Sequence, residues 1–144
     1  MSNFKDFIII DDDIINNKLC RKIIEKTFPD AAITDFINAR EGLDFIIEKY
    51  SKSGDEKVIV LLDISMPIMN AWEFLDVFDN LERGLKDRVK IHILSSSINK
   101  NDMMRAQTNS NVEYYLIKPL TKESIRLIVN VLNKKLGFSD EELI

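Results

Sequence analysis

The stretch Val58-Ile59-Val60-Leu61-Leu62-Asp63 places five consecutive apolar residues directly before an aspartate. A short apolar run without polar alternation is typical of a parallel β-strand that is buried on both faces. Further strands are predicted over Phe7 to Ile10, Val89 to Leu94 and Val112 to Ile117, and each is followed by a polar residue. Ala31 to Phe36 has a less apolar pattern and is interpreted as one more strand. The sequence therefore predicts five strands.

Helical patterns separate these strands. Asn38 with Glu41 three residues later resembles a capping box, and Thr121 is a second candidate for a helix cap. The predicted helices cover Ile15–Phe28, Asn38–Tyr50, the region from Trp72 to Leu81, Lys100–Gln107, and the segment from Thr121 to Lys135. Five strands that alternate with five helices predict an α/β fold: a doubly wound parallel sheet with helices on both faces.

Length and composition restrict the protein class. The 144 residues, 45% hydrophobic and 31% charged, fit one domain over 1–144, with a core at about 5–136 and a short acidic tail at 137–144. The net charge of −4 without a dense basic run argues against a nucleic-acid partner. Cys20 is the only cysteine, so an internal disulfide is excluded. No signal peptide or membrane span is expected, and the predicted location is cytoplasmic.

The residues that follow the strands carry the chemistry. Asp11 and Asp12 follow the first strand, Asp63 the third, Ser95 the fourth and Lys118 the fifth. In an open α/β sheet, ligands bind outside the carboxyl ends of the strands, so we expect these side chains to gather in one crevice. Clustered carboxylates without histidine or thiolate neighbours favour Mg²⁺, or Mn²⁺, over zinc.

The same set of residues suggests phosphoryl transfer. An ionised aspartate beside a metal ion can attack phosphorus without a general base. Lys118 and the metal would neutralise the transferring oxygens, and Ser95 would donate a hydrogen bond. The sequence has no Gly-rich phosphate loop, so a nucleotide is not the expected donor.

Four segments together resemble the receiver domain of bacterial two-component response regulators over nearly the whole chain. Each of the four closes a predicted strand, and they occur in the order expected for that family. They are Ile8-Ile9-Ile10-Asp11-Asp12-Asp13-Ile14-Ile15-Asn16, Leu61-Leu62-Asp63-Ile64-Ser65-Met66-Pro67, Leu94-Ser95-Ser96 and Leu116-Ile117-Lys118-Pro119-Leu120. The resemblance implies the strand order 2-1-3-4-5 of the flavodoxin-like receiver fold.

The resemblance also implies a role for each residue of the site. Asp63 would be the phosphoacceptor, and Lys118 would pair with its carboxylate or with the phosphoryl group. Ser95 would be the switch hydroxyl, and Tyr115 the aromatic residue that turns inward as Ser95 moves. The remaining implied features are metal ligands at Asp11, Asp12, Asp63 and the Ser65 backbone carbonyl, a phosphoryl-binding contribution from Ser96, and a cis Lys118-Pro119 bond. Ala71 departs from the family pattern, which has glycine there.

The implied function is a stand-alone switch in two-component or phosphorelay signalling, catalysing only its own phosphorylation and slow dephosphorylation. A sensor histidine kinase or a histidine phosphotransfer protein would donate the phosphoryl group. Output to a protein target, or onward relay, would use the surface of helix 100–107, strand 112–117 and the final helix. We expect a monomer or a weak homodimer, without membrane contact.

Two other interpretations remain open at this point. Ile8-Ile9-Ile10-Asp11-Asp12-Asp13 also matches the nucleophile motif of Mg²⁺-dependent phosphatases of the haloacid dehalogenase type, with Asp11 as nucleophile. That interpretation leaves the Asp63 motif unexplained and lacks a later acidic pair. The other alternative is a degenerate receiver that serves only as a scaffold, although the complete acidic set argues against it.

Overall fold

The computed structural model describes residues 3–139, and its centre is the all-apolar strand β3, every residue of which is buried. Parallel neighbours flank it on both sides and give the order β2-β1-β3-β4-β5, which confirms the predicted sheet. The strands are β1 (Asp6–Ile10), β2 (Ile33–Phe36), β3 (Val58–Leu62), β4 (Val89–Ser95) and β5 (Val112–Ile117). The weakly patterned strand β2 begins two residues later than the sequence predicted and lies at one edge.

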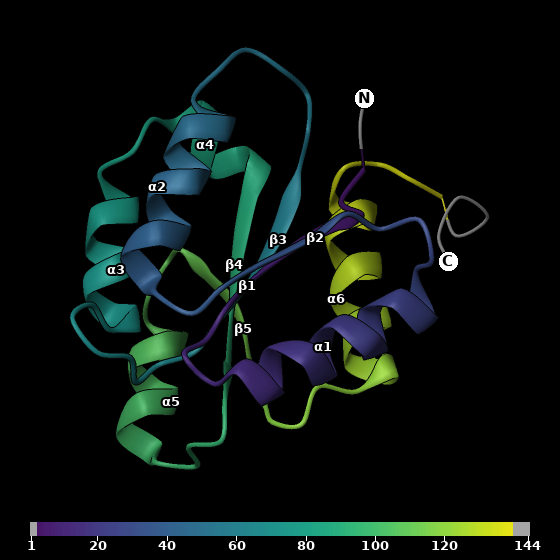
Figure 1. Cartoon of the computed structure of the whole chain (residues 1–144). Coiled ribbons are helices and arrows are strands. Elements are labelled where there is room, and N and C mark those ends of the chain that lie inside the picture. The colour runs from purple at the N-terminus through teal and green to yellow at the C-terminus, as the bar shows by residue number, and fades with distance from the viewer. Residues whose placement is uncertain (1–2, 140–144) are drawn as a thin grey trace.

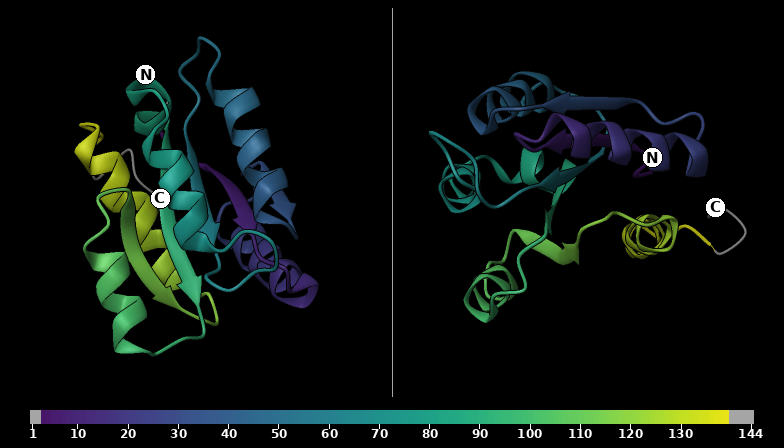
Figure 2. Two further views of the ribbon diagram at one scale, coloured as in Figure 1. Left: turned by 90° about the vertical axis from the view of Figure 1, so that its left-hand side faces the viewer. Right: turned by 60° about the horizontal axis from the view of Figure 1, so that its bottom comes forward.

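Helices cover both faces of this sheet (Figure 1). They are α1 (Ile14–Thr27), α2 (Ala39–Tyr50), α3 (Ala71–Asp79), α4 (Arg83–Arg88), α5 (Lys100–Gln107) and α6 (Lys122–Lys135). The helices α1 and α6 lie together on one face, while α2 to α5 cover the other. Figure 2 shows the twisted sheet between these two layers from two further directions. No helix within residues 3–139 is both long enough and apolar enough to cross a membrane.

Two cores explain the unbroken apolar strands. Side chains alternate across a strand, so Val58, Val60 and Leu62 pack under α2 to α5, whereas Ile59 and Leu61 pack under α1 and α6. Both faces of β3 therefore require apolar residues, which is why its sequence shows no polar alternation.

Capping side chains fix where the helices begin, next to the carboxyl ends of the strands. The carboxylate of Asp13 accepts hydrogen bonds from the first backbone N–H groups of α1. The side chain of Asn38 does the same for α2, and Asn70 forms a reciprocal capping box with Glu73 at α3. These bonds satisfy backbone donors that have no partner inside the helix. The caps thereby fix where the loops at this edge of the sheet join the helices.

The prediction of a single helix extending to Leu81 was wrong. Helix α3 ends at Asp79, and the separate helix α4 follows, so residues 3–139 contain six helices rather than five. Leu85 is the buried residue of α4 and packs into the core beneath α2 to α5. A helix of six residues with one buried position has too little periodicity to be recognised in a sequence.

Arg88, at the end of α4, anchors the loop between α2 and β3. Its guanidinium donates hydrogen bonds to the backbone carbonyls of Tyr50, Lys52 and Glu56 at 3.0, 2.9 and 2.8 Å. It also lies 5.4 Å above the centre of the Tyr50 ring. The loop between α2 and β3 is therefore fixed to the sheet by one side chain distant in sequence.

His92 is the one histidine of the chain, and it is fully buried in β4. Its ring stacks against Tyr114 with 6.2 Å between ring centres. The backbone carbonyls of Lys90 and Val60 lie close enough to favour a charged ring, yet neither ring nitrogen reaches hydrogen-bond geometry with a described residue. Burial dominates and lowers the pKa of His92 from 6.5 to about 4. A fully buried ring inside a strand fits a structural rather than a catalytic role for His92.

We expect the protein to lose stability between pH 6.5 and pH 4 because of His92. In this range the unfolded chain binds a proton that the native protein does not. The unfolding free energy therefore decreases as the pH is lowered, by about 3 kcal/mol in total. Replacing His92→Leu removes this contribution. Urea unfolding of both proteins at several pH values measures it, and parallel pH profiles would contradict the assignment.

Candidate functional site

The site lies at the carboxyl edge of the sheet, where backbone pairing continues just beyond the strands. The N–H of Asp63 donates to the carbonyl of Ile10 at 2.9 Å, and the N–H of Lys118 donates to the carbonyl of Ser95 at 2.9 Å. These bonds hold the residues after β3 and β5 beside the ends of the neighbouring strands β1 and β4. The predicted gathering of Asp11, Asp63 and Lys118 in one place follows from this register.

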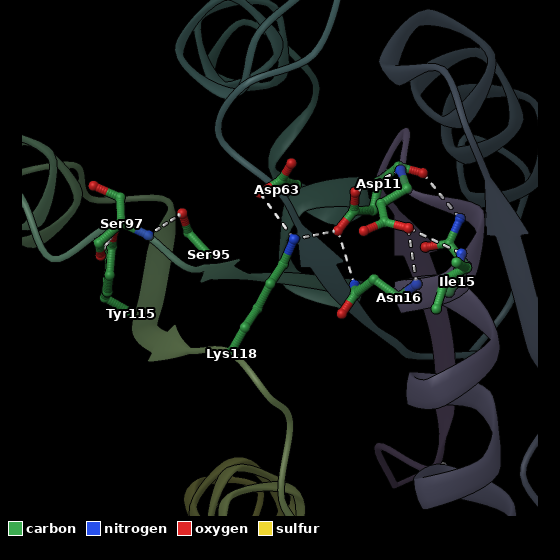
Figure 3. Close-up of polar contacts among 10 residues, drawn as sticks. Asp11, Ile15, Asn16, Asp63, Ser95, Ser97, Tyr115 and Lys118 are labelled. Carbon is green, nitrogen blue, oxygen red and sulfur yellow. Dashed lines mark hydrogen bonds and ion pairs between the residues drawn. The ribbon is translucent and has the colours of Figure 1, made fainter.

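Lys118 lies between two carboxylates (Figure 3). Its Nζ is 2.7 Å from Asp11 Oδ2 and 3.4 Å from Asp63 Oδ1. The side chains are unequally exposed, at 3% for Asp11, 12% for Asp63 and 18% for Lys118. The ammonium therefore binds the deeper carboxylate more closely and leaves Asp63 the more accessible of the two.

Asp11 is held by more partners than any other group of the site. Its Oδ2 accepts a second hydrogen bond, from Asn16 Nδ2 at 2.8 Å, and its Oδ1 accepts one from the Asp13 N–H at 2.9 Å. Asn17 Nδ2 donates to the Asp11 backbone carbonyl at 2.9 Å. Both asparagines come from the first turn of α1 and are buried. Neither asparagine was predicted from the sequence to belong to the site.

Burial and charge set the protonation of the pair. Burial, assisted by the negative charge of Asp11, raises the pKa of the Asp63 carboxyl to about 6, although Lys118 and the Ile64 N–H act in the opposite direction. For Lys118, burial opposes the charged form, but the hydrogen bond to Asp11 and the charges of both carboxylates outweigh it, so its pKa lies above the usual value. The ammonium is thus charged, and the acidic cluster has one cation for several carboxylates.

Three carboxylates are close enough to bind one metal ion. Asp11, Asp12 and Asp63 each offer an oxygen, and these oxygens lie within 4.8 Å of one another. Asp11 is buried, Asp63 is intermediate and Asp12 is exposed, so the cluster opens to solvent on one side. An all-oxygen donor set that is open to water suits Mg²⁺, which usually keeps several of its waters.

Ser97 connects the predicted switch residues to helix α5. Its N–H donates to Ser95 Oγ at 3.1 Å, and its carbonyl accepts from the Tyr115 hydroxyl at 2.8 Å. Its own hydroxyl donates to Asp102 in the first turn of α5 at 2.8 Å. Figure 3 shows Ser95, Ser97 and Tyr115 together on the opposite side of Lys118 from Asn16. Ser97 and Asp102 were not predicted as partners because they meet only through the loop conformation.

Within residues 3–139, the other predicted residues make no hydrogen bond or ion pair with the carboxylates. Ser65 and Ser96 are exposed, and the Ser95 hydroxyl is engaged with Ser97 rather than with Asp63 or Lys118. The Lys118-Pro119 bond is cis, the geometry that the resemblance implies. Ala71 is the first residue of α3 and has no positive φ, so alanine fits where glycine was expected.

Two known proteins are similar to this chain in sequence. The chain is 26% identical over 121 residues to the chemotaxis protein CheY of Halobacterium salinarum, covering 84% of this chain and 90% of that protein. It is 23% identical over 128 residues to stress response regulator protein 1 of Lodderomyces elongisporus, covering 89% of this chain but only 33% of that protein's length.

A solved structure has the same architecture. The two-component response regulator from Cytophaga hutchinsonii superimposes with a TM-score of 0.79 at 29% identity, covering 96% of this chain and all of that one. The family model described as "Response regulator receiver domain" matches residues 7–130, which include Asp11, Asp12, Asp63, Ser95 and Lys118. The chain belongs to the response regulator receiver domain family, the signalling modules of two-component systems.

Proposed function

We propose that Asp63 is the phosphoacceptor of this receiver domain. The observation that carries the proposal is the difference between the two carboxylates beside Lys118. Asp11 is almost fully buried, and three hydrogen-bond donors already contact its carboxylate oxygens. The carboxylate of Asp63 is more exposed and lies at the longer distance from Lys118. Asp63 is therefore the carboxylate that can approach a phosphorus atom.

The reaction needs few groups. A carboxylate oxygen of Asp63 attacks the phosphorus of the donor, a new O–P bond forms, and the bond to the leaving group breaks with its electron pair on that group. Lys118 lies within reach of the Asp63 carboxylate and would neutralise a phosphoryl oxygen. Ser95 would donate its hydroxyl to another phosphoryl oxygen once it turns away from Ser97.

Mg²⁺ is the metal that fits the site; Asp12, Asp63 and the Ser65 carbonyl would hold it, and Asp11 would act mainly through water. When bound, it supplies positive charge that offsets the charge on the transferring oxygens. Asp11 has one free lone-pair position at most on Oδ1, which supports a water-mediated role.

The proposed switch surface consists of α5, β5 and α6, which correspond to the helix 100–107, the strand 112–117 and the final helix named from the resemblance. Rotation of Ser95 toward a phosphoryl group would remove the acceptor of the Ser97 N–H. Ser97 contacts Tyr115 on β5 and Asp102 on α5. Phosphorylation at Asp63 would in this way alter a surface that binds a downstream protein, and relay to another histidine protein uses the same chemistry.

The direct test is the intact mass of the purified protein after incubation with acetyl phosphate. We expect a gain of one phosphoryl group when Mg²⁺ is present and no gain when a chelator removes it. Absence of any gain with Mg²⁺ would contradict phosphorylation by a small-molecule donor. It would favour the scaffold interpretation.

Exposed aliphatic side chains around the site indicate where a donor protein docks. Ile14, Ile15 and Leu19 on α1 are 54%, 70% and 54% exposed, and Ile68 and Ile98 in loops at the same edge are 86% and 76% exposed. Single exposed apolar residues are ordinary, but a group of them near a polar site is typical of a protein interface. We propose that the phosphohistidine protein contacts these residues.

Replacing Ile15→Asp is expected to slow transfer from a histidine-phosphorylated donor protein at least about tenfold, because an introduced charge opposes burial of the surface. Labelling by acetyl phosphate should remain at the wild-type rate, because that donor needs no protein contact. Leu127→Asp, a change at a 55% exposed leucine of α6, is the matched control. If Ile15→Asp slowed phosphorylation equally with the donor protein and with acetyl phosphate, a docking role for Ile15 would be contradicted.

A further inference from the structure

Asn16 has a buried amide that the proposed mechanism does not use. It lies at the third position of α1, and it is 8% exposed. Side chains on a helix point back toward the N-terminus of that helix, and the Asn16 amide accordingly reaches the carboxyl edge of the sheet. Its Nδ2 donates to Asp11 Oδ2 at 2.8 Å (Figure 3).

Two donors share one oxygen of Asp11. Lys118 Nζ and Asn16 Nδ2 both contact Oδ2, while the Asp13 N–H contacts Oδ1. A carboxylate has about four lone-pair positions, so three of them are taken and the one left is on Oδ1. The orientation of the carboxylate is therefore fixed, with Oδ1 as the oxygen still able to serve a metal ion or one of its waters.

The two donors differ in what the reaction requires of them. Lys118 would turn from Asp11 to the phosphoryl group once Asp63 is phosphorylated, since it already lies 3.4 Å from Asp63. Asp11 Oδ2 would then lose its cation while remaining buried, and a buried carboxylate that loses its partners is unstable. Asn16 belongs to helix α1, whereas Lys118 follows strand β5, so the Asn16 amide can keep its hydrogen bond to Asp11 when the Lys118 side chain moves.

The chemistry of an amide suits this position. A second cation beside Asp11 would neutralise the carboxylate and repel Mg²⁺, whereas an amide donates a hydrogen bond without adding charge. Groups that orient a metal-binding side chain typically change metal affinity 10- to 100-fold when they are replaced.

We infer that Asn16 is a positioning residue: its amide fixes Asp11 Oδ2, so that Oδ1 stays aimed at the metal position while Lys118 moves between Asp11 and the phosphoryl group. This inference rests on the proposed function of Asp63 and concerns the same site. The adjacent Asn17 provides a contrast, since it donates to the Asp11 backbone carbonyl and leaves the carboxylate alone.

The test compares Asn16→Ala and Asn16→Leu with the matched control Asn17→Ala in the full chain. Isothermal titration calorimetry with MgCl₂ measures the Mg²⁺ dissociation constant of each unphosphorylated protein. We expect both Asn16 variants to bind Mg²⁺ about tenfold more weakly. The Asn17 variant also loses a buried hydrogen bond from a side-chain amide, but its Mg²⁺ dissociation constant should stay within about threefold of the wild-type value. The leucine variant keeps the branched shape of the buried side chain but has no hydrogen-bonding group.

A second measurement separates positioning from a general loss of structure. At saturating Mg²⁺, both Asn16 variants should regain a phosphorylation rate by acetyl phosphate close to that of wild type. Equal weakening of Mg²⁺ binding in the Asn16 and Asn17 variants, or unchanged binding in all of them, would overturn the inference. A wild-type protein that takes up no phosphoryl group would instead contradict the proposed function. The Mg²⁺ titration does not depend on that step.

Discussion

Asp63→Asn is expected to abolish labelling by acetyl phosphate completely. Asparagine has nearly the same shape as aspartate but offers a weakly nucleophilic amide oxygen without charge, so no acyl phosphate can form. The fold should be retained, because the Asp63 N–H, which bonds to the Ile10 carbonyl, is unchanged. Intact-protein mass after incubation with acetyl phosphate and Mg²⁺ gives the result directly.

Asp11→Asn is the informative comparison for this experiment. We expect it to remain phosphorylated at Asp63, with a higher Mg²⁺ requirement, because one of the three clustered carboxylates has lost its charge. Labelling that survives in Asp63→Asn but disappears in Asp11→Asn would transfer the nucleophile to Asp11. That outcome would revive the phosphatase interpretation of the first aspartate motif.

Lys118→Met should give the largest loss of stability among the changes considered, about 3 kcal/mol of unfolding free energy without Mg²⁺. The methionine leaves the 3% exposed Asp11 carboxylate without a cation and removes the partial neutralisation of Asp63. Added Mg²⁺ should restore part of the loss, because a ligand that binds only the native state stabilises it by mass action. Urea unfolding with and without Mg²⁺ measures both effects.

Lys122→Met is the control for this change, since Lys122 is an exposed lysine in the first turn of α6. Its unfolding free energy should stay within about 0.5 kcal/mol of wild type, the usual range for surface substitutions. Equal unfolding free energies of the two variants in the absence of Mg²⁺ would show that the ion pair between Lys118 and Asp11 does not stabilise the fold.

The sheet and the identities of the acidic residues were predictable because they depend on local patterns. Runs such as Val58–Leu62 and Val89–Leu94 gave strands β3 and β4 almost residue for residue. Asp11, Asp63 and Lys118 could be placed together because each follows a parallel strand, and parallel strands end at one edge. The short helix α4 could not be predicted, since its single buried leucine produces no helical period.

The sequence by itself determined the class of fold, the edge of the sheet at which the site lies and the residues that resemble a phosphoacceptor site. Only the tertiary structure decided how those residues are paired. It showed that Lys118 binds Asp11 more closely than Asp63, that Asn16 shares Asp11 Oδ2, and that Ser97 links Ser95 to Tyr115 and Asp102. The reason is physical: strand patterns arise from burial, which acts residue by residue, whereas hydrogen bonds between side chains depend on loop and helix positions that distant parts of the chain set together.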